Sequence, residues 1–229
     1  MDRATHAPEL LDGPLDDQAA LVANLRDLGR LNWLTGGAAL SRRAIAALGD
    51  TTRLLDVGTG GADIPLSLLR AARRRGRAVS VTATDSRPEV LAAAHVAHPE
   101  IATTPGLTLA LADGLGLPYP DASFDVVHAS MVLHHLEAPE VVAFVREMRR
   151  VASRGIVVND LARSRHAWIG AWLLTRTIAT GRYTRNDGPL SVRRGWTRAE
   201  MVALLDQAGL VPVATLTGVA GHRYAIAAH

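Results

Sequence analysis

Short apolar runs alternate along most of the chain with segments whose apolar positions recur at helical spacing. The runs that are typical of buried strands lie at residues 53–56, 78–84, 107–112, 124–128 and 155–159. Helical segments lie between them at about residues 64–75, 88–97 and 138–151, and a turn at residues 153–155 is expected before the fifth strand. This alternation predicts an α/β fold built on parallel strands.

Both ends of the chain add elements to this core. Two amphipathic helices, at about residues 16–30 and 37–48, precede the first strand and are expected to cap the rim of the binding site. A helix at residues 197–208 is followed by a hairpin of residues 210–216 and 222–227. With 229 residues, the chain is long enough to bury a core as one domain.

Three consecutive strands end in a carboxylate. Asp56 closes the first strand, Asp85 the second and Asp113 the third. Because the carboxyl ends of parallel strands meet at the edge of the sheet where ligands bind, these acids are expected to converge. Three unrelated turns that each use an aspartate are the alternative interpretation.

A glycine turn follows the first strand and opens the next helix. Gly58, Gly60 and Gly61 have no Cβ atom, so the backbone is able to turn sharply and approach a ligand, with its N–H groups free at the helix start. The turn and the three acids together predict a site for a nucleotide-like ligand.

Asp63 distinguishes two classes of cofactor. A dinucleotide fingerprint has a third glycine at this position and a pyrophosphate at the helix N-terminus, where a carboxylate would repel it. S-adenosylmethionine (SAM) has no phosphate. It carries an α-ammonium group and a ribose diol, which donate hydrogen bonds to carboxylates, and a positively charged sulfonium, which carboxylates attract. The sequence therefore favours SAM, and a nicotinamide dehydrogenase is the weaker alternative.

These motifs resemble those of class I SAM-dependent methyltransferases, most closely the small bacterial group of ubiquinone/menaquinone-type and natural-product methyltransferases. The resemblance runs from about Thr52 to Gly209, and Ala62 departs from it where many relatives have a third glycine. It rests on residues 54–61, Asp85, residues 112–114, residues 117–127 and residues 132–136.

The resemblance implies a Rossmann-like sheet of seven mostly parallel strands with one antiparallel strand, helices on both faces, N-terminal helices and a helical lid inserted after strand five. A single methyltransferase domain at 1–229 is then expected. Its parts are N-terminal cap helices at 1–50, a SAM-binding core at 51–162, a lid at 163–196, and a C-terminal helix and β-hairpin at 197–229.

The resemblance also assigns cofactor contacts. Asp56 and Asp63 would lie near the amino group of SAM, Asp85 would accept from both ribose hydroxyls, and Asp113 from the adenine amine. Met131 or Leu133 would pack on the adenine ring. The full set of expected cofactor residues is Asp56, Gly58, Thr59, Gly60, Gly61, Asp63, Asp85, Ser86, Ala112, Asp113, Gly114, Ser130 and Met131.

Nearly forty residues separate the fifth strand from the last helix, far more than a usual strand-to-helix connection. This segment holds Trp168 and Trp172, which share one helical face, and Tyr183. We expect a lid in which Asp160, Trp168, Trp172 and Tyr183 bind a flat or greasy substrate. A helix pair that simply packs on the domain is the alternative.

Methyl transfer needs alignment and, for a protonated acceptor, a base. The candidates are His134, His135, His166 and Asp160; only one of the two adjacent histidines is expected to face the pocket. We assign the catalytic role to His135 and His166. Asp160 either orients a histidine at the end of strand five or caps the first lid helix.

The composition excludes several kinds of site and of targeting segment. There is no cysteine, hence no disulfide, thiolate metal site or cysteine nucleophile, and we expect no metal. All 25 basic residues are arginine, which raises the sequence pI to about 10.1 although the net charge is only +3. No apolar run reaches the roughly 18 residues that span a bilayer, and the N-terminus lacks a leader pattern. We expect a cytoplasmic bacterial protein, a monomer or homodimer, that binds no nucleic acid.

The expected function is SAM-dependent methylation of a small hydrophobic or aromatic, polyketide-like acceptor, with S-adenosylhomocysteine as the cofactor product. O-methylation is the first expectation and C-methylation of a quinone-type ring the second. A SAM-binding sensor or assembly protein without catalysis is the alternative from another class.

Overall fold

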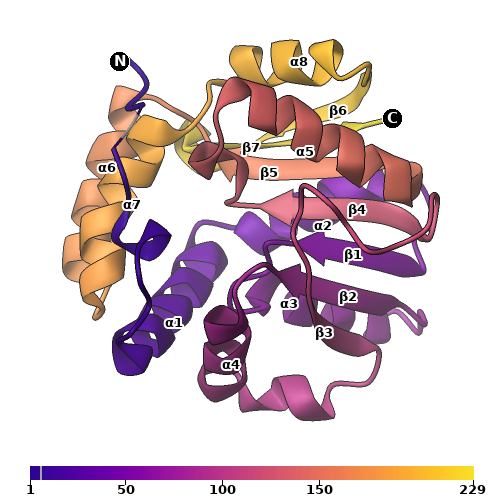
Figure 1. The fold of residues 1–229 in the computed structure, drawn as a ribbon, viewed down its shortest axis with the longest axis horizontal. Helices are drawn as coiled ribbons and strands as arrows, with labels where there is room; N and C mark the ends of the chain where they lie inside the picture. The colour runs from indigo at the N-terminus through magenta and orange to yellow at the C-terminus, as the bar shows by residue number, and fades with distance from the viewer. Residues whose placement is uncertain (6) are drawn as a thin grey trace.

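A seven-stranded sheet runs through the middle of the protein and carries helices on both faces (Figure 1). The structure is a computed structural model that describes residues 1–5 and 7–229. The strands are β1 (Arg53–Val57), β2 (Ser80–Asp85), β3 (Leu107–Leu111), β4 (Phe124–Ser130), β5 (Ala152–Leu161), β6 (Pro212–Thr217) and β7 (Arg223–Ala228).

The helices occupy the connections that the hydrophobic pattern predicts. The α-helices are α1 (Gln18–Leu34), α2 (Gly37–Ala46), α3 (Asp63–Arg73), α4 (Pro88–Ala97), α5 (Ala138–Val151), α6 (Arg165–Thr177), α7 (Arg182–Arg194) and α8 (Arg198–Gln207). Short 3-10 turns are η1 (Leu10–Asp12), η2 (Pro99–Thr103), η3 (Leu133–His135) and η4 (Val219–Gly221).

The sheet has the strand order β3-β2-β1-β4-β5-β7-β6. Strands β1 to β5 pair in parallel, and β7 pairs antiparallel with both β5 and β6. The expected mostly parallel sheet with one antiparallel strand is therefore confirmed. The order reverses between β1 and β4, which is the position where open α/β sheets bind their ligands.

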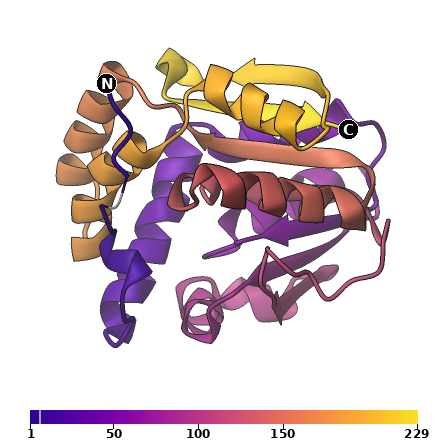
Figure 2. The same cartoon turned by 45° about the horizontal axis from the view of Figure 1, so that its top comes forward.

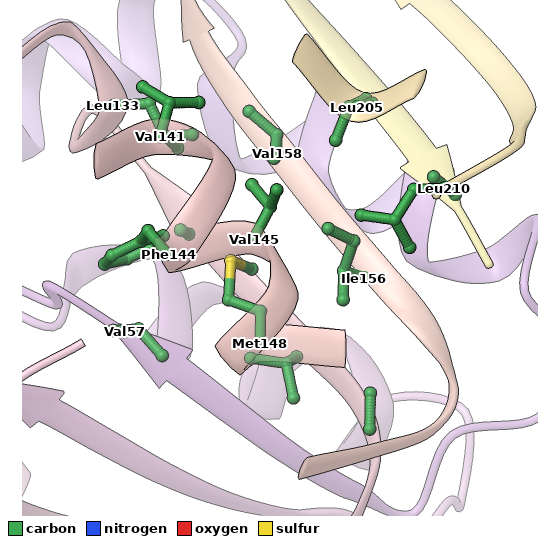
Figure 3. Close-up of a cluster of buried hydrophobic side chains, with 14 of the residues drawn as sticks. Val57, Leu133, Val141, Phe144, Val145, Met148, Ile156, Val158, Leu205 and Leu210 are labelled. Atoms are coloured by element: carbon green, nitrogen blue, oxygen red, sulfur yellow. The ribbon is translucent and has the colours of Figure 1, made fainter. Parts of the chain in front are cut away.

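The central strands are apolar because both of their faces are covered. On one face, Val145 and Met148 of α5 and Leu205 of α8 lie with Ile156 of β5 in a single buried cluster (Figure 3). On the other face, α2 and α3 cover Leu54, Val126 and Val157. The sheet is thus fixed from both sides, and its carboxyl edge is the part left for a binding site.

The predicted turn at residues 153–155 is wrong. Strand β5 begins at Ala152, directly after α5, and its register against β4 shifts by one residue, so that Phe124 pairs with Ala152 but Val126 with Gly155. The extra residue forms a β-bulge, which places the exposed Ser153 and Arg154 outside the regular ladder. Polar residues that resemble a turn in sequence are accommodated here within a strand.

The two N-terminal helices have different positions, so the expectation that both cap the rim is only half right. Helix α1 runs beside α4 at the carboxyl end of the sheet. Helix α2 packs flat on the sheet through Leu40, Ala44 and Ile45 and does not reach the rim. The apolar stripe of α2 matches the sheet face and explains its place.

Helices α6 and α7 form a hairpin beyond the carboxyl ends of the parallel strands, where α7 packs against α1 (Figures 1 and 2). The N-terminal segment runs along α7: Ala4 N–H donates to Arg193 O, and the backbone N–H groups of Leu10 and Leu11 donate to the carboxylate of Asp187. The described residues before and within η1, residues 1–5 and 7–12, therefore lie between the hairpin and the sheet edge.

Candidate functional site

A cavity of about 360 Å³ opens at the carboxyl ends of β1, β2, β3 and β4, at the point where the strand order reverses. The structure brings all thirteen residues of the expected cofactor set to its wall. These are Asp56, Gly58, Thr59, Gly60, Gly61, Asp63, Asp85, Ser86, Ala112, Asp113, Gly114, Ser130 and Met131.

The glycine turn after β1 has a backbone that few other residues adopt. Gly58 has a φ of +70°, and a Cβ atom there would lie 2.5 Å from Val132. Ala62 also has a positive φ, of 56°, although it carries a side chain. This left-handed conformation disfavours alanine and explains why glycine suits the position in relatives.

Asp85 ties the glycine turn to the second strand. Its Oδ2 atom accepts from Gly60 N–H at 3.1 Å and its Oδ1 atom from Arg87 N–H at 3.1 Å. Burial raises the pKa of Asp85, and these two hydrogen bonds oppose the rise. One expectation changes here: the N–H of Gly60 is bonded to a carboxylate and is not free for a ligand.

The third acid stands more openly at the rim. Asp113 is exposed, and its Oδ1 atom accepts from Leu115 N–H at 3.0 Å. Met131 also lines the cavity, whereas Leu133 is fully buried in the core and does not. Of the two residues expected to pack on adenine, only Met131 is placed to do so.

The chemistry of the cavity wall fits SAM. Its charged residues are five acids against one arginine and one histidine, namely Asp12, Asp56, Asp63, Asp85 and Asp113 with Arg87 and His135. This excess of negative charge suits an ammonium and a sulfonium and opposes a pyrophosphate. In addition, the buried hydroxyl of Thr59 at the wall has no hydrogen-bond partner among the described residues. A ligand would satisfy it.

A chain of buried hydrogen bonds leads from Asp56 into the protein. Asp56 Oδ1 lies 2.5 Å from His128 Nδ1, and His128 Nε2 lies 2.8 Å from Ser41 Oγ. The side chain of Asn159 donates to Ser41 Oγ at 2.7 Å and to Gly37 O at 3.0 Å. All of these side chains are buried, so the position of Asp56 is fixed by the sheet and by α2.

The chain continues to the second acid of the glycine turn. Arg223 Nε donates to Asn159 Oδ1 at 3.0 Å, and Arg223 Nη1 donates to Asn32 Oδ1 at 2.8 Å. Asn32 in turn donates to Asp63 Oδ2 at 3.0 Å. A Cβ atom at Gly37 would lie 2.2 Å from Arg223 Nη1, so glycine is required for this approach. We call the whole series from Asp56 to Asp63 the buried polar network.

Arg223 supplies the positive charge of the buried polar network. Only 2 % of its surface is exposed. Burial lowers the pKa of Arg223, and the nearby Asp160 and Asp63 oppose this. Burial raises the pKa of Asp63, and Asn32 and Arg223 are among the groups that oppose it. Of the two acids at the cavity wall, Asp63 thus lies near this internal cation, whereas Asp56 is connected to it only through the hydrogen-bonded side chains between them.

The two adjacent histidines have separate surroundings, as expected. His135 lines the cavity, and its Nδ1 atom lies 2.9 Å from Asp12 Oδ1. His134 is buried, and its Nδ1 atom lies 2.8 Å from Asp160 Oδ1. Charge from the histidines and hydrogen bonds lower the pKa of Asp160 against the effect of its burial. Each imidazole is oriented by its own carboxylate.

Glu9 lies between these two histidines. Its carboxylate oxygens are 3.9 Å from His134 Nε2 and 3.9 Å from His135 Nε2, and Oε1 accepts from Ser191 Oγ at 2.9 Å. Burial raises the pKa of Glu9 to about 7. Glu9, His134 and His135 have ligand atoms within 4.8 Å of one another and could accommodate a cation, although the guanidinium of Arg194 already lies 4.0 Å from Glu9.

The lid residues do not reach the cavity, which corrects several expectations. His166 is exposed on α6, and none of Asp160, Trp168, Trp172 and Tyr183 lines the cavity wall. Tyr183 is buried in the cluster that joins α1 and α4. The physical reason is that α1 and the N-terminal segment stand between the hairpin and the cavity.

Asp160 is also not the cap of α6. That helix begins after Ser164, whose hydroxyl accepts from Ala167 N–H at 3.1 Å. Asp160 is fully buried at the end of β5 and orients His134 instead.

The residues that sequence reasoning missed come mainly from the N-terminal segment. Leu11, Asp12 and Leu15 line the cavity, and Arg87 holds this segment in place by donating to Leu11 O and Gly13 O. Their only signal in sequence is an apolar pair between acids, Glu9-Leu10-Leu11-Asp12, which has no helical or strand period.

Replacing Arg223 by methionine tests the buried polar network. Arg223→Met leaves Asn159 and Asn32 without their donor and Asp63 without its cation, so the free energy of unfolding should fall by about 3 to 5 kcal/mol. Urea denaturation measures this. The exposed Arg198→Met is the matched control and should change it by less than about 0.5 kcal/mol. Equal free energies of unfolding for the two variants would show that Arg223 does not stabilise the fold.

Replacing Glu9 by glutamine tests its raised pKa. The unfolded chain releases the Glu9 proton near pH 4.5, and the folded protein releases it near pH 7. Protonated Glu9 therefore contributes fully to the free energy of unfolding below pH 4.5, and this contribution is lost as the pH rises from 4.5 to about 7. Wild type should therefore lose roughly 3 kcal/mol relative to Glu9→Gln between about pH 5 and about pH 8. Urea denaturation in EDTA measures it, and a difference that is constant with pH would contradict the burial argument.

Comparisons with known proteins agree with the site. Residues 55–158 match the family model of a methyltransferase domain. The chain is 31 % identical over 100 residues to the ubiquinone/menaquinone biosynthesis C-methyltransferase UbiE of Rickettsia akari, which covers 44 % of this chain and 40 % of the relative. It is 35 % identical over 117 residues to the phosphatidylethanolamine N-methyltransferase of Cereibacter sphaeroides. This match covers 49 % of this chain and 53 % of that relative. The match thus spans about half the length of these relatives.

The fold is similar to that of a solved methyltransferase. Human N-acetylserotonin methyltransferase, solved in complex with SAM, superposes with a TM-score of 0.67 at 13 % identity, covering 96 % of this chain and 60 % of that one. The matched methyltransferase domain contains the glycine turn, Asp85 and Asp113, all of which line the cavity. In its sheet, its cavity and the match at residues 55–158, the chain is similar to the class I SAM-dependent methyltransferases.

Proposed function

We propose that the protein transfers a methyl group from SAM to a hydroxyl oxygen of a small hydrophobic or aromatic acceptor of the polyketide type. The observation that carries this proposal is the imidazole of His135, which stands at the wall of the SAM cavity and is oriented by Asp12 at 2.9 Å. A base of this kind serves an acceptor that arrives protonated, such as a phenol.

The cofactor end of the cavity is assigned as follows in this proposal. Asp56 and Asp63, which the buried polar network holds on either side of the glycine turn, bind the ammonium group. Asp85 accepts from the ribose diol, since each of its oxygens has a lone pair left beyond its one backbone hydrogen bond. Asp113 accepts from the adenine amine, and Met131 packs on the ring.

The other end of the cavity suits an apolar acceptor. Apolar side chains of the N-terminal segment and α1, with one residue before α5, contribute to its wall. These side chains are Leu11, Leu15, Leu21, Leu28 and Leu136. Such a wall excludes water and orients a flat ring by shape, while the few polar groups beside it fix the reacting atom. We therefore move the acceptor site from the α6–α7 hairpin to this surface.

SAM supplies an electrophilic methyl group on a positively charged sulfur. The protein aligns the acceptor oxygen with that methyl group, and alignment alone is able to contribute roughly 7 to 11 kcal/mol. Nε2 of His135 takes the acceptor proton, and Asp12 holds the opposite ring nitrogen and stabilises the imidazolium that results. Glu9 lies 3.9 Å from the same Nε2 atom and, with a pKa of about 7, is suited to exchange that proton onward.

C-methylation of a quinone-type ring is the second candidate. It is favoured by the similarity to the C-methyltransferase UbiE, which the chain matches over 100 residues. The two outcomes are distinguished by product chemistry, since O-methylation removes an exchangeable hydroxyl proton and C-methylation leaves every hydroxyl in place.

We further propose a cytoplasmic monomer or homodimer that acts on small molecules and not on nucleic acid, with the parts 1–50, 51–162, 163–196 and 197–229 forming one domain. No helix among the described residues is long and apolar enough to cross a membrane.

Replacing Asp85 tests the cofactor site. Asp85→Ala removes two charge-assisted hydrogen bonds to the ribose, so calorimetric titration should show SAM binding weakened by about a hundredfold or more. The exposed Asp206→Ala is the matched control and should bind SAM like wild type. Circular dichroism verifies that both variants are folded. Unchanged affinity in folded Asp85→Ala would refute the ribose assignment.

Replacing His135 tests the acceptor end. With an acceptor found by mass-spectrometric screening of phenols and quinones, His135→Gln should lower kcat by about 10² to 10⁴ and leave SAM affinity unchanged. His166→Gln, on the exposed face of α6, should keep the wild-type rate. A His135→Gln enzyme that retains full kcat across the pH range would exclude His135 as the base and favour the C-methylation candidate.

A further inference from the structure

Helix α6 turns three of its large apolar residues away from the protein. The side that packs inward carries the buried small residues Ala167 and Thr175 together with the half-buried Leu174, and Thr175 lies against α7 at Gly188. The outward side presents Ile169, Trp172 and Leu173. This is the reverse of the usual arrangement, in which a surface helix buries its apolar stripe.

These outer side chains form one continuous face. Ile169 is 50 % exposed, Trp172 39 % and Leu173 50 %. Together with the exposed Arg165 and Arg176 they occupy positions i, i+4, i+7, i+8 and i+11, which share one side of a helix. We call these five residues the outer face of α6.

The segment that carries the outer face contains arginines but no acid. The chain has no acid between Asp160 and Asp187, whereas this stretch contains five arginines. Neither Arg165 nor Arg176 forms an ion pair within residues 1–5 and 7–229. Arg176 lies over the ring of Trp172, with its guanidinium carbon 4.3 Å from the ring centroid. A tryptophan and two aliphatic residues are thus flanked by free cations.

We propose that the outer face of α6 docks on the surface of an anionic lipid bilayer. In this position Trp172, Ile169 and Leu173 enter the boundary between headgroups and acyl chains, and Arg165 and Arg176 contact lipid phosphates. The helix lies in the plane of the interface and does not cross it, in agreement with its 13 residues.

The charge pattern selects a bilayer over a second copy of the chain. In a symmetric dimer formed through this face, the arginines of one copy would meet the arginines of the other with no acid between them. An anionic surface instead complements both ends of the face. The inference concerns a surface that is separate from the SAM cavity, so it stands or falls independently of the proposed reaction.

Co-sedimentation with vesicles tests the proposal. The 229-residue protein should bind vesicles made of equal parts phosphatidylglycerol and phosphatidylcholine. It should bind much more weakly to vesicles of phosphatidylcholine alone, and much more weakly to the mixed vesicles at high salt. Trp172→Gln/Leu173→Gln and Arg165→Gln/Arg176→Gln should each lower the partition coefficient by about tenfold. Because all four side chains are exposed, both variants should keep the thermal stability of wild type.

Matched controls are available elsewhere on the surface. Val96→Gln/Val211→Gln removes two similarly exposed apolar side chains, and Arg74→Gln/Arg75→Gln removes the same charge at the end of α3; both should bind vesicles like wild type. The proposal is overturned if wild type does not bind anionic vesicles or if the controls weaken binding as much as the α6 variants. A dimer in sedimentation equilibrium that Trp172→Gln/Leu173→Gln dissociates would also overturn it, since the face would then bind a second copy.

Discussion

The buried charge of Arg223 is the constraint on which the binding site depends. A buried guanidinium is stable only if its donors have acceptors and an acid lies near. Here the acceptors are Asn159, Asn32 and Ser130, and Asp63 and Asp160 supply the negative charge. Because Arg223 lies in β7 and these partners lie in α1, α3, β4 and β5, one side chain connects the C-terminal strand to the N-terminal helix. The two acids on either side of the glycine turn, Asp56 and Asp63, are the two ends of this network, so the rigidity of the core is transmitted to the cavity wall.

The acceptor end depends on a segment that contributes nothing to the sheet. The segment at residues 10–17 supplies Leu11, Asp12 and Leu15 to the cavity wall, and hydrogen bonds to Asp187, Arg87 and Arg194 hold it there. In this arrangement the α6–α7 hairpin supports the N-terminal segment from behind. Its outer side carries exposed apolar residues and arginines, and the partner that we propose for it is an anionic membrane surface.

Local signals account for what the sequence predicted well. Helices at 88–97 and 138–151 were predicted to the residue because their apolar periodicity and their N-terminal prolines are local features. The strand-end acids and the glycine turn also follow from neighbouring residues, and all of them line the cavity. The roles proposed for them remain predictions.

What the sequence did not reveal depends on contacts between distant residues. Asp12 and His135 are 123 positions apart, and Arg223 and Asn32 are 191 apart. The spacing of apolar residues along the sequence does not predict contacts between residues so far apart. The strand that holds His128 was predicted, but a histidine inside a strand gives no sign of the carboxylate it will contact. The tryptophans of α6 were interpreted as a substrate wall because aromatic residues suit a pocket, yet only the packing of α6 shows which way they point.

The most direct test of the central claim is a crystal structure of the protein with S-adenosylhomocysteine. The account predicts the amino group between Asp56 and Asp63, the ribose hydroxyls on Asp85, adenine beside Asp113 and Met131, and the sulfur facing His135. A ligand bound elsewhere, or bound here with its ribose away from Asp85, would contradict it.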